Sequence, residues 1–111
     1  MAKTLKLTDP ASNKVYTLEY TRATVAQMER EGFVLRSVED RPMLSLPALF
    51  AGAFKAHHRM VKAEVIQSIF DRTKNREKLF QKLVEMYNEP IAAMLEEPEE
   101  SEGNVDWATD F

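Results

Sequence analysis

Cysteine is absent from the 111-residue sequence, and glycine and long apolar runs are scarce. Without cysteine, the chain can form no disulfide, no thiolate metal site and no cysteine nucleophile. Its three glycines, Gly32, Gly52 and Gly103, lie too far apart for a phosphate-binding loop, and Gly52 falls inside a predicted helix, which indicates close helix–helix packing. The longest mostly apolar stretch, residues 42–56, is too short to cross a bilayer, and the N-terminus lacks the apolar core of a signal peptide. We therefore expect a cytoplasmic protein without membrane contact.

The polar residues form no pattern typical of a catalytic or metal site. His57 and His58 are sequence neighbours, and adjacent helical side chains diverge by about 100°, which makes them a poor chelating pair. Glu39 and Asp40 precede a turn, whereas general acid–base catalysis requires held, partly desolvated groups. The sequence thus predicts no enzyme, no metal and no cofactor.

The N-terminal part of the sequence predicts a β-hairpin followed by a helix. Residues 4–8 and 15–20 alternate apolar and polar side chains, and a run of turn-forming residues separates them. Thr21 is a predicted N-cap for a helix over residues 22–31, which ends at Gly32 because glycine readily adopts a left-handed cap.

Apolar periodicity predicts three further helices, over residues 46–58, 62–71 and 76–95. A single helical turn is expected near Ser37. Pro90 should kink or split the last helix, because proline removes one intrahelical hydrogen bond.

Charge is distributed unevenly along the chain. Of the 18 acids, seven lie in residues 96–111, which contain no lysine or arginine, so residues 1–95 hold 11 acids against 15 bases and carry about +4. Residues 96–104 combine proline, glycine, serine and five acids, and such a segment cannot bury enough apolar surface to fold alone. We predict one α+β domain over residues 1–95, with the hairpin packed on about four helices, and a disordered, flexible acidic tail over residues 96–111.

Two charged segments each allow three interpretations. The tail is a solubilising segment, a recognition segment in which Trp107 and Phe111 anchor a partner while the acids steer it, or a segment that folds back on the basic body. The basic cluster is solvated surface, a contact for acids of this chain or a partner, or a nucleic-acid site. Phe70 and Phe80 fall on the predicted core stripe, which disfavours base stacking. The basic cluster comprises Arg72, Lys74, Arg76, Lys78 and Lys82, with Arg59 and Lys62 earlier in the chain.

Several segments in a fixed order resemble a known family. These are VYTLEYTR (15–22), QMEREGF (27–33), RP (41–42), LFAGAF (49–54), LVEMYNEP (83–90) and GNVDW (103–107). Together they resemble the small tail assembly chaperones of long-tailed phages and prophages of Gram-positive bacteria, over most of the chain. The resemblance implies a non-enzymatic chaperone in the host bacterial cytoplasm that holds the tape measure protein, recruits tail tube subunits and leaves before the virion is complete.

The resemblance assigns no binding role to individual residues. An apolar helix face beyond the needs of the core could bind an amphipathic client helix, and the candidates are Leu46, Leu49, Phe50 and Phe54; the alternative is that all four are ordinary core. The separated charges also favour self-association. Two rival functions remain: a small virion structural protein at the head–tail junction or in tail completion, and a small nucleic-acid-binding regulator.

Overall fold

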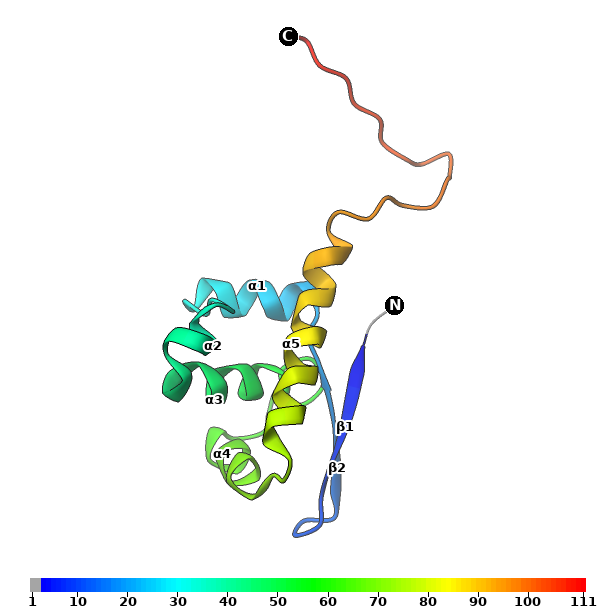
Figure 1. The fold of residues 1–111 in the computed structure, drawn as a ribbon. Coiled ribbons are helices and arrows are strands. Elements are labelled where there is room, and N and C mark those ends of the chain that lie inside the picture. The colour runs from blue at the N-terminus through cyan, green and yellow to red at the C-terminus, as the bar shows by residue number, and fades with distance from the viewer. Residues whose placement is uncertain (1–2) are drawn as a thin grey trace.

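A computed structural model, which describes residues 3–111, has an α+β architecture in which a two-stranded hairpin packs beside five helices (Figure 1). This confirms the predicted fold class. In the described part of the chain, no helix is long and apolar enough to span a bilayer. The elements are β1 (Thr4–Asp9), β2 (Lys14–Glu19), α1 (Arg22–Arg30), α2 (Ser37–Asp40), α3 (Pro42–Gly52), α4 (Ala63–Arg72) and α5 (Arg76–Ala93).

The hairpin is antiparallel, and its second strand is held on both edges. Register pairs Leu5 with Leu18 and Leu7 with Tyr16, so the apolar side chains share the face that packs on the helices. On the far edge of β2, the Glu19 amide donates to the Ala53 carbonyl at 3.0 Å. The hairpin is therefore joined to the segment that follows α3.

Helix α1 begins and ends where the sequence predicts, to within one residue. The side chain of Thr21 accepts a hydrogen bond from the Thr24 amide at 3.1 Å. The side chain of Thr24 in turn accepts one from the Thr21 amide at 2.8 Å, and the two bonds form a capping box. After the helix, Gly32 adopts a left-handed φ of 96°. The expected close packing at Gly52 is also confirmed, because a Cβ there would lie 2.5 Å from the Sδ of Met28.

The predicted bounds of α3 are wrong at both ends. The helix starts at Pro42, where a missing amide costs nothing in the first turn, and it ends at Gly52 instead of continuing to residue 58. Beyond Gly52 the chain turns through residues 53–57, which frees the Ala53 carbonyl to bond with β2. A continued helix would have used that carbonyl internally.

Helix α5 is not split at Pro90, which lies inside a continuous helix. Only the carbonyl of Met86 loses its usual partner. Leu83, Met86 and Tyr87 anchor this helix in the core, with exposures of 0%, 5% and 2%. The packing of the turn before the proline outweighs one missing hydrogen bond.

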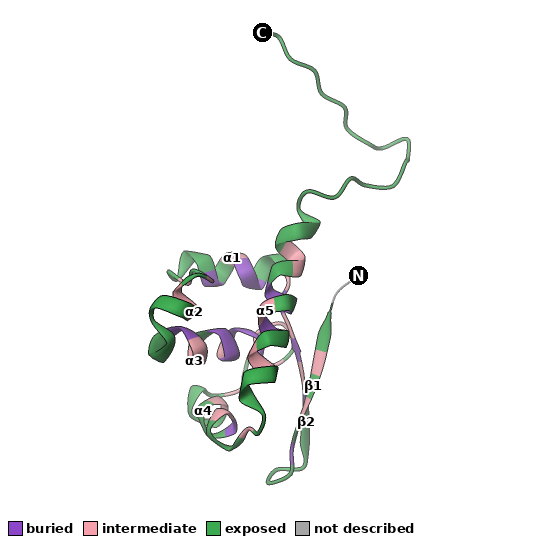
Figure 2. Ribbon diagram, in the orientation of Figure 1, coloured by how far each residue is buried: buried purple, intermediate pink, exposed green. Residues whose placement is uncertain are grey.

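The core lies between β2 and the inner faces of α1, α3 and α5 (Figure 2). Tyr20 is central to it, because its hydroxyl donates to the Leu49 carbonyl at 2.6 Å and its ring meets Tyr87 edge-on at 5.3 Å. Burial raises the pKa of Tyr20 well above its usual range. Each fully buried apolar side chain in such a core contributes about 1.5–3 kcal/mol.

Residues 96–111, hereafter the tail, form no helix or strand and are exposed throughout (Figure 2). The tail leaves the C-terminal end of α5 and extends away from the body (Figure 1). Its described hydrogen bonds are local: the Asn104 side chain donates to the Glu99 carbonyl at 3.0 Å and accepts from the Ser101 hydroxyl at 2.8 Å.

Candidate binding surfaces

The histidines and the buried acid serve structural roles. His57 pairs with Glu19 at 2.6 Å, and the Nε2 atom of His58 accepts from the Thr17 amide at 2.9 Å. Burial, assisted by the neighbouring His57, lowers the pKa of His58 and favours the neutral ring that can accept this bond. Among residues 3–111, no group of three or more histidines or acids is placed to hold a metal ion.

Asp9 is a buried acid of the hairpin, and two guanidinium nitrogens of Arg72 donate hydrogen bonds to its carboxylate. The two N–O distances are 2.8 and 3.1 Å, and the carboxylate also accepts from the Ala11 amide and the Ser12 hydroxyl. The Arg72 hydrogen bond holds the pKa of Asp9 well below its usual range. Asp9 therefore remains a charged anchor and is not poised to move protons.

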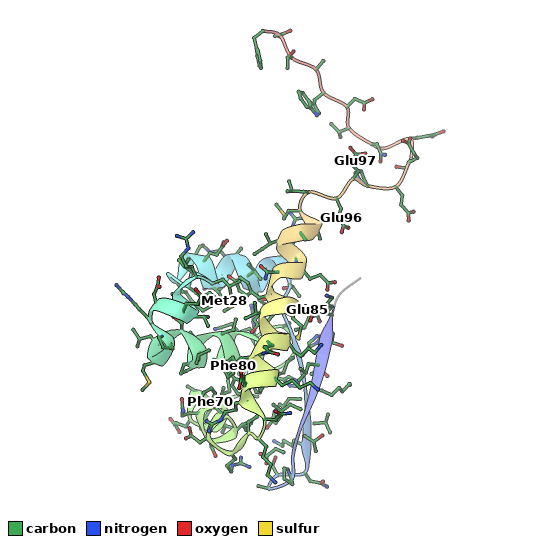
Figure 3. All side chains as sticks on the ribbon, in the orientation of Figure 1. Met28, Phe70, Phe80, Glu85, Glu96 and Glu97 are labelled. Carbon is green, nitrogen blue, oxygen red and sulfur yellow. The ribbon has the colours of Figure 1, made fainter. Side chains whose placement is uncertain are left out.

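For Arg72, the contact with Asp9 therefore supports the interpretation in which the basic cluster binds an acid of this chain. A second member, Arg76, lies 5.4 Å from the ring centre of Phe70. The rings of Phe70 and Phe80 meet edge-on between α4 and α5, with 5.8 Å between their centres, and both are only partly exposed (Figure 3). Because these rings are packed, they are not free to stack on bases.

An apolar groove runs between α1 and the C-terminal end of α5, with a volume of about 620 Å³. Ile91, Met94 and Leu95 line it with exposures of 44%, 57% and 90%. Charges at its margin are limited to one of each sign, Arg22 and Glu29. The remaining apolar lining consists of Ala23, Val25, Ala26 and Pro90, and this surface is called the apolar groove below.

A second surface, called the basic groove below, lies between the start of β2 and the segment that leads into α4. It has a volume of about 880 Å³. Its cations are Lys14, Arg59 and Lys62, and no acid lines it. Between the cations lie the exposed apolar side chains Val15, Met60 and Val65.

The structure corrects the predicted client surface. Leu49, Phe50 and Phe54 have exposures of 0%, 1% and 1%, so they are core residues and do not form an accessible face. Leu46 is half-buried, and its binding role stays a prediction. Trp107 and Phe111 are fully accessible, at 84% and 106%, and their role as anchors also stays a prediction.

Sequence reasoning missed the apolar groove, although a signal for it existed. Ile91 and Met94 continue the apolar periodicity of the last helix past Pro90, to a stretch of α5 where α1 forms the opposite side of the groove. Ala23 and Ala26 are small, so α1 leaves a groove there instead of filling it. Glu96 and Glu97 begin the tail directly beyond this groove (Figure 3).

Comparison with known proteins yields a single family. Its sequence profile, described as a domain of unknown function (DUF5055), matches residues 1–111. No curated protein and no solved structure matches the chain. The matched range includes both the body and the tail, so the acidic tail is part of the family unit and not an appendage to it.

Proposed function

The chain belongs to the DUF5055 family, and we propose that it acts as a non-enzymatic tail assembly chaperone, which binds the tape measure protein of a long-tailed phage and helps to recruit tail tube subunits. Its place of action is the host bacterial cytoplasm, where tails are assembled. Two observations support the proposal. The first is the resemblance of six ordered sequence segments to that family of chaperones, and the second is the apolar groove.

The apolar groove carries the proposal because its chemistry suits a long helical client. An amphipathic helix binds by laying its apolar face into such a groove. Met94 and Leu95 are exposed and unbranched at Cβ, and methionine in particular adapts to differently shaped partners. A chaperone that holds a long client in many copies must accept many different helical stretches, and an adaptable apolar surface with few charges allows this.

Co-expression with the tape measure protein of the same gene cluster, followed by affinity capture of this chain, tests the proposal. We expect a soluble complex with many copies of this chain per client. Met94→Asp should lose client capture by about 100-fold, because a charge would be buried against an apolar helix face. Met43→Asp is the matched control, since Met43 is 88% exposed at the start of α3 and lies outside the groove.

Circular dichroism must show that both variants remain folded. If the client stays insoluble and no complex is captured, or if the two variants behave alike, the proposal is wrong. The rival function, a virion structural protein, predicts that this chain remains in purified particles, whereas a chaperone should be missing from them.

A further inference from the structure

We propose that the basic groove binds the end of the tail, residues 105–111, from a second copy of this chain, so that copies associate head to tail. This inference concerns self-association and does not depend on the tape measure protein. It stands on three observations: cations without partners, an exposed apolar floor between them, and a tail end with the matching pattern.

The cations of the basic groove lack the ion-pair partners that some other cations of the body possess. Lys14, Arg59 and Lys62 are all exposed and make no ion pair within residues 3–111. By contrast, Arg72 is held by Asp9, and Lys3 and Lys82 both approach Glu85. The basic groove is therefore a concentration of uncompensated positive charge that favours an acidic ligand.

The floor of the basic groove is apolar and accessible. Met60 is 91% exposed, and Val15 and Val65 are 53% and 40% exposed. Cations that flank exposed apolar side chains suit a segment with both acids and apolar groups. A purely acidic polymer would leave the apolar floor in water, and a purely apolar segment would leave the cations unused.

The tail end has this mixed character in alternating order. In an extended segment, side chains alternate between opposite faces. Residues 105–111 read VDWATDF, so one face carries Val105, Trp107 and Phe111 and the other carries Asp106 and Asp110. The apolar face fits the floor of the groove, Trp107 can stack on Arg59, and the acids remain at the height of the flanking cations.

Direction and length favour the tail of a second copy over the chain's own. The tail leaves the upper end of α5, whereas the start of β2 and α4 lie at the lower end (Figure 1). Helix α5 has 18 residues and is therefore about 27 Å long. The chain's own tail would have to reverse direction and run back along the whole of α5, which takes about two thirds of the roughly 40 Å that the residues from Ala93 to Val105 can reach. The tail of a second copy needs no reversal.

A head-to-tail contact uses two different surfaces and leaves one of each unoccupied on every pair. Such a heterologous interface can add further copies until the geometry closes. Positive bodies and negative tails also attract in this order, while body–body and tail–tail contacts repel.

Sedimentation velocity on the full-length chain, without any other protein, tests the proposal. We expect the average mass to rise with concentration beyond that of a dimer. The groove variant Arg59→Glu/Lys62→Glu and the tail variant Trp107→Ser/Phe111→Ser should each weaken association by about tenfold or more. Lys74→Glu/Lys78→Glu is the control, since it makes the same charge change at exposed sites outside the groove and should associate like the unaltered chain.

Mixing the two defective variants provides the decisive result. The groove variant retains a tail and the tail variant retains a groove, so together they should form a 1:1 complex that grows no further. Failure of the mixture to associate, or equal association of all variants, would overturn the proposal.

The remaining outcome is docking of the tail on its own body. In that case the chain would be a monomer at every concentration, and the fluorescence emission of Trp107 would shift in the variant Arg59→Glu/Lys62→Glu. This result would also overturn the proposal. Because no tape measure protein is present, this failure is distinguishable from a failure of the chaperone proposal.

Discussion

The two grooves lie at opposite ends of the body and differ in what they can select. The apolar groove presents Ile91, Met94 and Leu95 with one charge of each sign at its margin. The basic groove presents three cations around an apolar floor and has no acid in its lining. Apolar contact acts only at short range and is insensitive to salt, whereas charge acts over about 10 Å and is screened by salt.

This difference would allow one small chain to hold the two proposed binding functions independently of each other. A shape-selective surface at one end suits a variable helical client, and a charge-selective surface at the other suits one fixed sequence, the tail end. Since the two surfaces share no residue, each can be altered without the other. Four changes would break or sharpen this comparison.

Phe54→Ala should have the largest effect on stability, because it removes a buried ring from the core. The substitution lies in neither of the two groove surfaces. The ring is 1% exposed and lies 5.5 Å from Tyr16 and 5.2 Å from Phe50. We expect the free energy of unfolding to fall by about 3 kcal/mol in urea denaturation. Met43→Ala, at an 88% exposed site, should stay within about 0.5 kcal/mol of the unaltered chain. Equal stability of the two variants would restore Phe54 as a docking candidate.

The second largest effect should come from salt, which should weaken binding at one groove and not at the other. Between about 50 mM and about 500 mM salt, self-association through the basic groove should weaken about tenfold, because the contact charges are exposed. Capture of the client through the apolar groove should change by less than about twofold over the same range. If both respond alike, charge is not what distinguishes the two ends.

Gly52→Ala should shift the apolar end alone. The new Cβ would meet the Sδ of Met28 on α1, which costs about 1–3 kcal/mol, partly offset by the better helix propensity of alanine, up to about 1 kcal/mol. A net loss of about 1 kcal/mol and weaker client capture are expected. Met28→Ala should make the second change neutral or favourable, a coupling that a double-mutant cycle measures. Simple additivity of the two changes would show that α1 is not positioned by this contact.

The smallest effect concerns pH, and it belongs to the basic end, since the only two histidines of the chain lie there. The folded-state pKa of His58 is lowered, so the unfolded chain binds the proton more readily. Stability is therefore complete above the unfolded pKa of about 6.5 and falls as the pH drops below it. Thermal unfolding between pH 7 and pH 5 should show this loss, and His58→Gln, which keeps an acceptor, should flatten it. An unchanged slope in the variant would assign the proton to another group.

Local signals in the sequence predicted the elements well. Thr21 and Gly32 define α1 because capping depends on residues within one turn of the helix end. The end of α3 was not predictable in this way, because it depends on the hydrogen bond between the Ala53 carbonyl and the Glu19 amide of β2. These two residues are more than 30 positions apart in the sequence. Tertiary contacts override periodicity at such places.

The candidate sites were predicted less well for a related reason. Periodicity identifies which face of a helix is apolar but not whether a neighbour covers it. Phe50 and Met94 both lie on apolar stripes, yet Phe50 is 1% exposed and Met94 is 57% exposed. The pairing of Asp9 with Arg72 was invisible for the same reason, because no local pattern joins a hairpin turn to the end of α4.

The contacts that hold the hairpin also fix an order of events on the ribosome. Thr17, Asp9 and Lys3 can form these contacts only after His58, Arg72 and Glu85 have been synthesised. The partners lie 41, 63 and 82 positions later in the chain, respectively. At a synthesis rate of about 5–20 residues per second, the hairpin turn emerges several seconds before its arginine. The segment that is made first is thus the last to be secured, and a nascent chain that stalls before α4 presents the apolar face of its hairpin to the cell.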